Sequence, residues 1–317
     1  HYLLRSAEYT SGYMSISKGI RPNQWDLDPQ EHSRMSVLLP PIREQTAIAN
    51  FLDRETGKID ALVEEQKRLI VLLKEKRQAV IAHMVTRGLN PGAQMKSSGI
   101  EWLGEVPDHW EVTTVRRLAG SIQTGRTPKS ETPAQELENG IPWFTPGDFD
   151  GQLHLTYASK QISQECIDSG EGSYFPAGSV LVVSIGATLG KVGLAIVPCS
   201  ANQQINAVVP CESVRGEFLA YSLAVKTDFM RYLSNASTIG IMNQEKTKEI
   251  PIAVPPLSEQ DAIIDFISTF ASEIDALINE AEAAIGLLQE RRSSLISAAV
   301  IGKINVCGLV SDQVEAA

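Results

Sequence analysis

Two long stretches of the chain carry apolar residues at alternating spacings of four and three. The first stretch contains Ile48, Leu52, Ile59, Leu62, Leu69, Leu73 and Val80, and the second contains Ile263, Ile267, Phe270, Ile274, Leu277, Leu288 and Leu295. This spacing predicts two amphipathic helices, over residues 43–85 and 258–299, each with an apolar seam for another helix. A helix of about 40 residues is roughly 60 Å long, more than a small domain needs for its own core. The pattern therefore indicates a spacer.

The two stretches are copies of one sequence. Residues 37–48 return without a gap as residues 252–263, at an offset of 215 residues. Each copy passes through Pro40-Pro41 or Pro255-Pro256 into its helix, since two prolines can neither continue a strand ladder nor lie inside a helix. We therefore expect an antiparallel pair with the Pro-Pro sequences at opposite ends. We assign the seam and partner docking to Ile59, Leu62, Leu69, Leu73, Ile274, Leu277 and Leu288.

Short alternating or wholly apolar runs, bounded by Gly and Pro, lie between the two helices. They predict strands over 110–115, 141–144, 179–185, 192–197 and 205–209, and a helix over 214–233. The fold class is therefore α+β, a globular domain of mixed strands and helices plus two long helices that form an antiparallel coiled-coil spacer. We assign 1–36 to the C-terminal remnant of a first globular domain, 37–90 to the first spacer helix, 91–254 to a second globular domain, 255–305 to the second spacer helix, and 306–317 to a disordered tail.

The charge balance argues against a protein that binds DNA alone. The chain has 28 Lys and Arg against 38 Asp and Glu, a net charge of −10, and a pI near 5.1. Phosphate neutralisation by cations supplies most non-specific DNA affinity, so partner subunits would have to supply much of the positive field. No apolar run approaches the roughly 18–20 residues of a membrane helix, and no signal peptide precedes the first domain. We expect a cytoplasmic protein whose given sequence starts within a domain, at His1.

No catalytic centre emerges from the motifs. The run Gly186–Lys191 has three residues between its glycines and Val192 after the lysine, so it predicts a glycine-rich hairpin rather than a nucleotide-binding loop. Neither Pro-Pro pair has the acidic or amide residue and the aromatic residue that flank the prolines in adenine methyltransferases. Glu65-Gln66-Lys67 fits a nuclease tripeptide but lies within a heptad helix. Four cysteines and five histidines form no metal-ligand spacing.

Several ordered motifs resemble the specificity subunits of type I restriction-modification enzymes. They are the twice-repeated Pro-Pro-x-x-Glu-Gln-x-x-Ile, Trp110 with residues 124–128, Ile141-Pro142-Trp143, the run 178–191, and residues 202–206. The resemblance implies that the globular domains are target-recognition domains that each read half of a split DNA sequence in phage defence. It also implies that the spacer helices dock two methyltransferase subunits, with a restriction subunit joining the complex.

The resemblance assigns no enzyme activity and no cofactor to this chain. S-adenosylmethionine, ATP and Mg²⁺ would belong to partner subunits. The partners of the chain would be double-stranded DNA, methyltransferase and restriction subunits, and a second copy of itself. Members of the family start with a complete first recognition domain, whereas here residues 1–36 match only its tail. The chain could be a fragment, or a half-subunit that dimerises to restore two recognition domains. In either case we expect one recognition domain, and one half-site, in these residues.

Polar residues on glycine-rich loops are the candidates for DNA contact. Residues 101–249 carry 11 Lys and Arg against 17 Asp and Glu, so the few loop cations stand out. The candidates are Arg126, Thr127, Lys129, Thr188, Lys191, Asn243, Gln244 and Lys246. Each could equally be an ordinary solvated loop residue. Asn202, Gln203 and Asn206 rank below them, since they could be buried residues that fix loops.

Two other interpretations remain open at this point. A coiled-coil adaptor without DNA readout explains the acidity better, but not the polar-loop domain between the helices. An enzyme with an unfamiliar site would require binding of S-adenosylmethionine by the chain itself. The sequence does not specify the DNA target.

Overall fold

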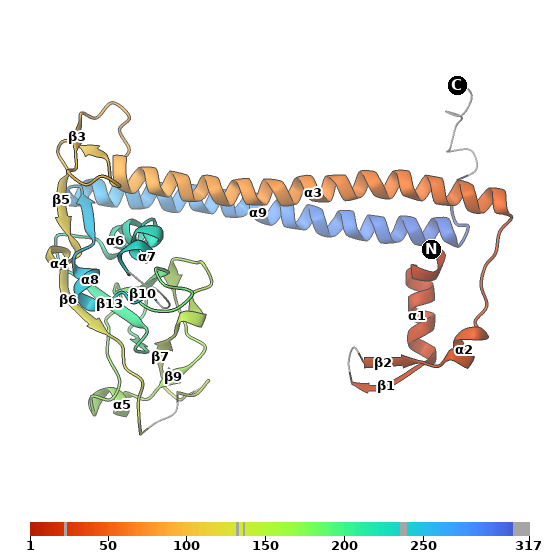
Figure 1. Ribbon diagram of the computed structural model, residues 1–317, viewed down its shortest axis with the longest axis horizontal. Coiled ribbons are helices and arrows are strands. Elements are labelled where there is room, and N and C mark those ends of the chain that lie inside the picture. The colour runs from red at the N-terminus through yellow and green to blue at the C-terminus, as the bar shows by residue number, and fades with distance from the viewer. Residues whose placement is uncertain (22–23, 131–132, 136, 235–239, 307–317) are drawn as a thin grey trace. The chain divides into compact units, whose positions relative to one another are not determined.

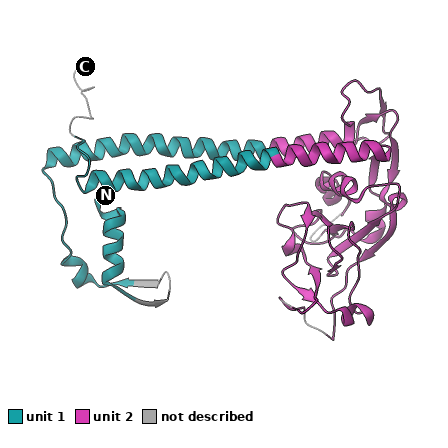
Figure 2. Cartoon of the chain, turned by 180° about the vertical axis from the view of Figure 1, so that it is seen from behind, with its two compact units in different colours: residues 1–74, 273–317 teal, residues 75–272 magenta. Residues whose placement is uncertain are grey.

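A computed structural model describes residues 1–21, 24–130, 133–135, 137–234 and 240–306 (Figure 1). The chain forms two compact units, unit 1 with residues 1–74 and 273–317 and unit 2 with residues 75–272 (Figure 2). The long helices α3 (Ile42–Arg87) and α9 (Leu257–Val300) each contribute to both units. Nearly all of the predicted tail, residues 307–317, lies outside the described residues.

The two long helices are antiparallel, as the repeat predicts. In unit 1, Phe51 and Leu52 near the start of α3 form a core with Ala299 and Val300 at the end of α9. Further along α3, Asp60 accepts a hydrogen bond of 2.8 Å from Nε of Arg292. In unit 2, the end of α3 and the start of α9 share one apolar core, to which Ile81, Val85, Ile263 and Ile267 contribute. The fold class, α+β with an antiparallel helix pair, is confirmed.

The seam follows a register that differs from the predicted one at three leucines. Leu62 and Leu277 are 46% and 48% exposed, whereas Val63 and Ile278, one residue further on, are 7% and 8% exposed. Leu69 is also exposed, beside the half-buried Ile70. The observed seam keeps spacings of four and three because it includes the polar residues Thr56 and Gln66. The prediction chose the nearby leucines instead, which moves the seam by one residue, or about 100° around the helix. Ile59, Leu73 and Ile274 are buried, and Leu288 is half-buried.

Unit 1 adds a small set of elements to its part of the helix pair. They are a 3-10 turn (Leu3–Arg5), α1 (Ala7–Ile16), a hairpin of β1 (Ser17–Arg21) and β2 (Gln24–Leu27), and α2 (Pro29–Ser33). Asp28 caps α2 by accepting from the backbone N–H groups of Gln30 and Glu31. At the repeat offset, Asn243 caps α8 (Gln244–Lys248) in unit 2 through the N–H of Lys246. The domain boundaries remain a prediction, but this short helix before the Pro-Pro occurs in both units.

Unit 2 contains four small sheets, and its largest has five strands. The order in that sheet is β6 (Ala119–Thr124), β13 (Ile205–Pro210), β10 (Val180–Val183), β11 (Val192–Ala195) and β8 (His154–Leu155), of which only β8 pairs in parallel. The other strands are β3 (Met95–Ser97) with β4 (Glu105–Pro107), β5 (Glu111–Thr114) with β14 (Pro251–Val254), and β12 (Ser200–Ala201), β7 (Ile141–Phe144) and β9 (Gln161–Ile162) in one sheet. The remaining helices are α4 (Val115–Leu118), η2 (Pro146–Asp148), α5 (Gln164–Asp168), α6 (Gly216–Ala224) and α7 (Thr227–Leu233).

The central strand β10 separates two apolar cores. Val180 and Val182 face the core that contains α6 and the ends of the long helices, whereas Leu181 and Val183 face a second core with Phe144, Phe149 and Phe175. Because successive side chains of a strand point to opposite faces, burial of both faces requires an uninterrupted apolar run. This burial explains why the sequence over 180–183 shows no alternation, and it holds the loops at the ends of β6, β10 and β13 in fixed positions.

The Pro-Pro-x-x-Glu-Gln motif anchors helix α9 to the globular domain. Glu259 accepts hydrogen bonds from Nε1 of the buried Trp110 (3.1 Å) and from His109, whose Nε2 lies 2.7 Å away. The fully buried Gln260 donates to the carbonyl oxygens of Ser213 and Pro255 and accepts from the N–H of Arg215. Gly88, with a φ of 73°, ends α3 directly against Trp110 and Glu259.

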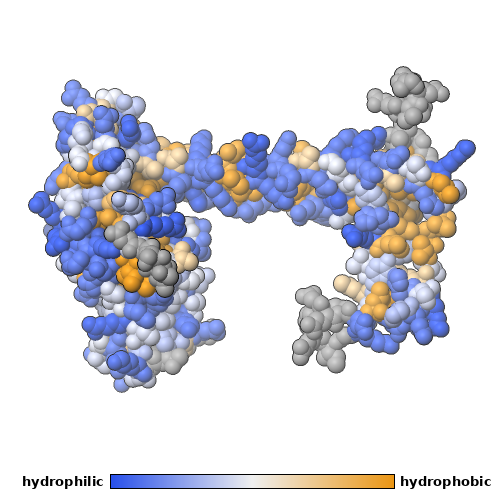
Figure 3. Space-filling model, in the orientation of Figure 1, coloured by the Kyte–Doolittle hydropathy of each residue, from blue (hydrophilic) through white to orange (hydrophobic). Residues whose placement is uncertain are grey.

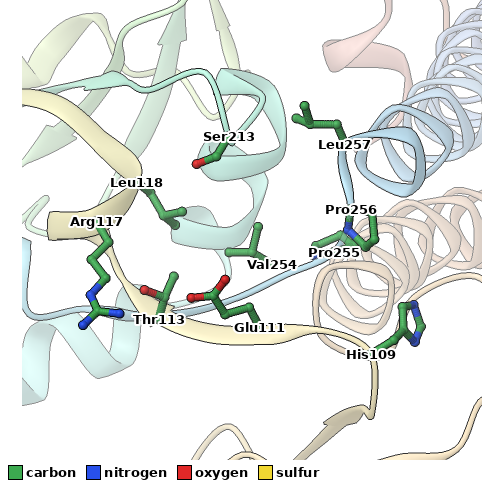
Figure 4. Close-up of a pocket in the computed structure, with 10 residues that line it drawn as sticks. All are labelled: His109, Glu111, Thr113, Arg117, Leu118, Ser213, Val254, Pro255, Pro256 and Leu257. Atoms are coloured by element: carbon green, nitrogen blue, oxygen red, sulfur yellow. The ribbon is translucent and has the colours of Figure 1, made fainter.

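A shallow pocket of about 370 Å³ lies beside this anchor (Figure 4). Glu111, Thr113 and Arg117 come from β5 and α4, and face Val254–Leu257 across it. The pocket therefore lies where β14 passes through the Pro-Pro into α9.

Candidate nucleic-acid interface

The loop after β6 is held close to the strand that precedes β13. Gly125 donates its N–H to the carbonyl of Ile205 (2.9 Å), and Arg126 donates its N–H to the carbonyl of Ala201 (2.8 Å). A Cβ on Gly125 would lie 2.3 Å from the carbonyl oxygens of Ala201 and Asn202, so only glycine fits there. In addition, Nε1 of Trp143 donates to the carbonyl of Arg126 (3.0 Å). These contacts fix the backbone, while the side chains of Arg126, Thr127 and Lys129 stay exposed.

A single carboxylate holds the outer part of this loop. Glu171 accepts from the N–H groups of Lys129 (2.9 Å) and Ser130 (2.8 Å), and from the Ser130 hydroxyl. The hydrogen bonds from Ser130 and then Lys129 lower the pKa of Glu171, so it is ionised at neutral pH. Arg126 donates from Nη1 to the carbonyl of Gly170 (2.8 Å), and Thr127 hydrogen-bonds to Gln203. Arg126, Thr127 and Lys129 therefore line one open cavity of about 610 Å³, together with Glu171 and Gln203.

A hydrogen-bonded network joins this loop to the start of α8. Thr124 donates to Oδ1 of the buried Asn206 (2.8 Å) and accepts from Nε2 of Gln244 (2.9 Å). Asn206 in turn donates to the carbonyl of Met242 and to the hydroxyl of Thr247. A second cavity of about 420 Å³ is lined by Thr124, Gln203, Asn243, Gln244 and other residues of this region. Since Gln203 lines both cavities, the two form one polar surface.

The remaining candidates lie outside both cavities, and the two lysines among them have partners within the domain. Thr188 and Lys191 lie in the turn between β10 and β11, which is the predicted hairpin, but neither lines the two cavities. Nζ of Lys191 donates to the carbonyl of Phe149 (2.6 Å). Nζ of Lys246 donates to the carbonyls of Ser234 and Ile241. Both ammonium groups therefore act within the domain.

Some cations of unit 2 are already paired with carboxylates. Arg116 bridges Glu245 and Glu249, and Lys248 pairs with Glu245. Within the described residues, neither the Arg126 guanidinium nor the Lys129 ammonium group forms an ion pair, although the backbone N–H of Lys129 donates to Glu171. Both cations also line the open cavity, so they are placed to meet a phosphate or a base edge.

The structure brings five of the eight predicted DNA-contact residues together: Arg126, Thr127, Lys129, Asn243 and Gln244. Asn202 and Asn206 are buried hydrogen-bonding residues that fix loops. Gln203 is more prominent than the sequence indicates, because it is the residue common to both cavities. The role of Glu171 has no sequence signal, since its partners lie more than 40 positions away.

Comparison with known proteins identifies the family. The sequence model of the type I restriction modification DNA specificity domain matches residues 107–286, and the chain belongs to this family. It is 28% identical over 178 residues to the MjaIX specificity subunit of Methanocaldococcus jannaschii, covering 55% of this chain and 40% of that protein. It is 21% identical to the EcoDI specificity subunit of Escherichia coli, covering 85% of this chain and 62% of that subunit. The chain thus spans less than two thirds of the length of these relatives.

Two solved structures share the fold. A chain from a type I R-M system superposes with a TM-score of 0.72 at 21% identity, covering 96% of this chain and 70% of its own length. The HsdS subunit of Thermoanaerobacter tengcongensis superposes with a TM-score of 0.55 at 20% identity, covering 96% and 69%. In the part of the chain that the structure describes, no helix is long and apolar enough to cross a membrane, and no cluster of metal ligands occurs.

Proposed function

We propose that the chain reads one half-site of a bipartite DNA target through unit 2, and docks methyltransferase subunits through its helix pair. The observation that carries the proposal is the family match over residues 107–286, which contains the complete polar surface around Gln203. Arg126 and Lys129 position phosphates or contact base edges, and Thr127, Gln203, Asn243 and Gln244 offer donors and acceptors. The family match favours this function over a coiled-coil adaptor.

The chain itself performs no catalysis in this proposal. Methylation with S-adenosylmethionine and cleavage with ATP and Mg²⁺ belong to the methyltransferase and restriction subunits of the complex. The role of the chain is then to place a methyltransferase at a chosen sequence. Binding of S-adenosylmethionine by the purified chain would support the enzyme interpretation instead.

Exposed leucines on the helix pair support the docking role. Leu62, Leu69 and Leu72 of α3, and Leu277 and Leu287 of α9, are all at least 43% exposed, and each directly precedes a seam residue. Leu62 repeats as Leu277 and Leu72 as Leu287 at the offset of 215 residues. The twofold axis that exchanges two antiparallel helices is perpendicular to their common plane, so equivalent residues lie on one face. Hydrophobic residues interrupt the hydrophilic surface of the pair in Figure 3. Such a repeated apolar face fits two copies of one partner.

Methylation mapping tests the proposed function. Genomic DNA from cells that express the chain with its methyltransferase subunit should carry methylation at a defined sequence that is absent when the chain is omitted. The Arg126→Ala and Lys129→Ala double variant should lose most of this methylation. Sequence-specific methylation without the chain would refute the proposal, and so would full methylation with the double variant.

A further inference from the structure

The cavity that Gln244 lines differs in charge from the cavity beside it. Its volume is about 420 Å³, and none of the described residues that line it is Lys or Arg. Its carboxylate, on Glu245, pairs with Lys248, whose hydrogen bond lowers the pKa of that carboxyl, so it is ionised at neutral pH. The neighbouring cavity is lined by Arg126 and Lys129 instead. A phosphate therefore suits the cavity with the cations, and an uncharged base edge suits the cavity at Gln244.

A buried asparagine fixes the direction of the hydrogen bonds beside this second cavity. Asn206 is 1% exposed, and one end of its side-chain amide lies 2.7 Å from the carbonyl oxygen of Met242 and 3.0 Å from the hydroxyl of Thr247. Because a backbone carbonyl can only accept, the end of the amide that faces Met242 must be Nδ2. Oδ1 of Asn206 is therefore the atom that faces the hydroxyl of Thr124, 2.8 Å away.

The orientation of the Gln244 amide follows from this direction. Since Oδ1 of Asn206 can only accept, the Thr124 hydroxyl donates its single proton there and has only lone pairs for other partners. Gln244 lies 2.9 Å from the same hydroxyl oxygen and must present Nε2 to it. The opposite orientation would place Oε1 against a lone pair with no proton between the two oxygens. The half-buried Gln244 thus keeps Oε1 and one N–H for a ligand in the cavity.

Two other amides of this surface are less suited to reading a base. Gln203 contacts the exposed hydroxyl of Thr127, and a hydroxyl can rotate either to donate or to accept. Asn243 uses Oδ1 to accept from the N–H of Lys246, so only its donors remain for a ligand. Gln244 is therefore the residue whose acceptor and donor positions are both set before DNA binds.

We propose that Gln244 reads an adenine in the recognised half-site. In the major groove, adenine presents the N7 acceptor beside the N6 amino donor, whereas guanine presents two acceptors, N7 and O6. The free N–H of Gln244 donates to N7 and Oε1 accepts from the amino group, whereas O6 of guanine would meet Oε1 without a proton. Gln244 is then a specificity-determining residue, and Thr124 is a positioning residue that acts through it. The inference rests on the proposed function and deepens it by naming one base of the target.

Methylation mapping of the chain with its methyltransferase subunit gives the first test. The wild-type complex should require adenine at one position of the half-site, and Gln244→Ala should reduce the preference for adenine there at least about tenfold. The base preferences at the other positions should stay unchanged. Gln152→Ala is the matched control, because Gln152 is exposed in unit 2 and lines neither cavity.

Base analogues test the two hydrogen bonds one at a time. Each adenine of the mapped half-site is replaced in turn by unsubstituted purine, which lacks the amino group, or by 7-deazaadenine, which lacks N7. At the position that Gln244 reads, each analogue should weaken binding by the wild-type complex about fivefold in gel shifts. Binding by the complex with Gln244→Ala should be nearly the same for adenine and both analogues at this position.

Variants of Thr124 test the orientation of the amide. Thr124→Val frees the Gln244 amide to turn and present its N–H groups to O6, so guanine should become about as acceptable as adenine. Thr124→Ser keeps the hydroxyl and should retain the preference for adenine. A merely structural role of Thr124 would lower stability and total methylation without changing the preferred base.

The outcomes separate this inference from the proposed function. Equal binding of adenine and both analogues by the wild-type complex, at every adenine of the half-site, would overturn the inference even if the variants fail to fold. Base preferences that stay unchanged with both Gln244→Ala and Thr124→Val would overturn it as well. Failure of the proposed function differs from both results, because the wild-type complex would then methylate no defined sequence, and the inference would fall with it.

Discussion

At the scale of single residues, Arg126 and Lys129 are expected to act through charge. Each occupies the exposed loop after β6, and neither charged group forms an ion pair among the described residues. Arg126→Ala and Lys129→Ala should each weaken DNA binding by the complex, and should reduce the slope of log K against log salt by about 1 per lost phosphate contact. Fluorescence anisotropy at several salt concentrations measures this slope.

The matched control for these variants is Lys96→Ala. It removes one positive charge from β3, where Nζ contacts the carbonyl of Asp108. Lys191→Ala should behave differently from the loop variants, because it leaves the carbonyl of Phe149 without its donor. We expect a loss of about 1–3 kcal/mol in the free energy of unfolding and an unchanged salt slope. A salt slope that falls with Lys191→Ala alone would place the DNA elsewhere on the domain.

The buried Lys226 predicts an unusual pH dependence of stability. It is 3% exposed, and burial lowers its pKa from 10.5 to about 8. The unfolded chain therefore holds more protons than the folded chain between about pH 8 and pH 10.5, so the contribution of Lys226 to stability rises with pH across this window. The Trp102 ring, 5.2 Å from Nζ, offsets part of the burial.

Lys226→Met tests this contribution. At pH 7 the variant should be more stable than the wild type by about 1–3 kcal/mol, because it removes a charge from the core. The difference should shrink as the pH rises from 8 to 10. Urea unfolding of both proteins at pH 7 and pH 10 measures it, and a constant difference would mean that Lys226 is solvated in the folded protein.

At the scale of elements, substitutions in the helix pair can distinguish the buried seam from the exposed leucines beside it. Val63→Asp and Ile278→Asp each place a carboxylate in the buried seam and should lower the free energy of unfolding by about 3 kcal/mol or more. Leu62→Asp and Leu277→Asp, one residue earlier, should leave stability within about 1 kcal/mol and instead reduce co-purification of the methyltransferase subunit. Equal destabilisation by both sets would contradict the observed register.

The sequence predicts an element well where the spacing of apolar residues along the chain determines its type and its ends. The long helices were expected over residues 43–85 and 258–299, and they extend from Ile42 to Arg87 and from Leu257 to Val300. The strand over 141–144 matches β7 residue for residue. The predicted helix over 214–233 is two helices instead, because α6 ends at Ala224 and Lys226 turns into the core.

The candidate site is less predictable because its geometry comes from distant contacts. Residue type alone selects Arg126, Lys129, Lys191 and Lys246 equally. Only the fold shows that Lys191 and Lys246 lie outside both cavities, with their ammonium groups on backbone carbonyls. Arg126 and Lys129 line an open cavity, although Arg126 also donates to the carbonyl of Gly170. Likewise, Leu62 and Val63 are both aliphatic, as are Leu69 and Ile70, so residue type does not decide which of them faces the seam. The structure shows that Val63 is buried and Ile70 half-buried, whereas both leucines are exposed.

At the scale of the whole molecule, the net charge of −10 predicts weak DNA binding by the chain alone. Addition of methyltransferase subunits should raise the affinity at least about a hundredfold at physiological salt, because their cations would neutralise phosphates beside the recognised half-site. Gel shifts with and without co-expressed methyltransferase measure the difference. Tight and specific binding by the isolated chain would contradict the prediction.

The symmetry of the DNA target is the broadest prediction. Among the described residues, only unit 2 holds a complete polar surface of the kind around Gln203, so this part of the protein is expected to read one half-site. If this chain is the only specificity component, a second half-site must come from a second copy, and twofold symmetry then requires an inverted repeat with a fixed spacer. Supplying a different recognition domain before Pro40-Pro41 should change one half of the methylated sequence and leave the other half unchanged. Methylation mapping of both complexes distinguishes these outcomes. A target with two unlike halves, methylated when this chain acts alone with its methyltransferase, would show that each chain reads both half-sites.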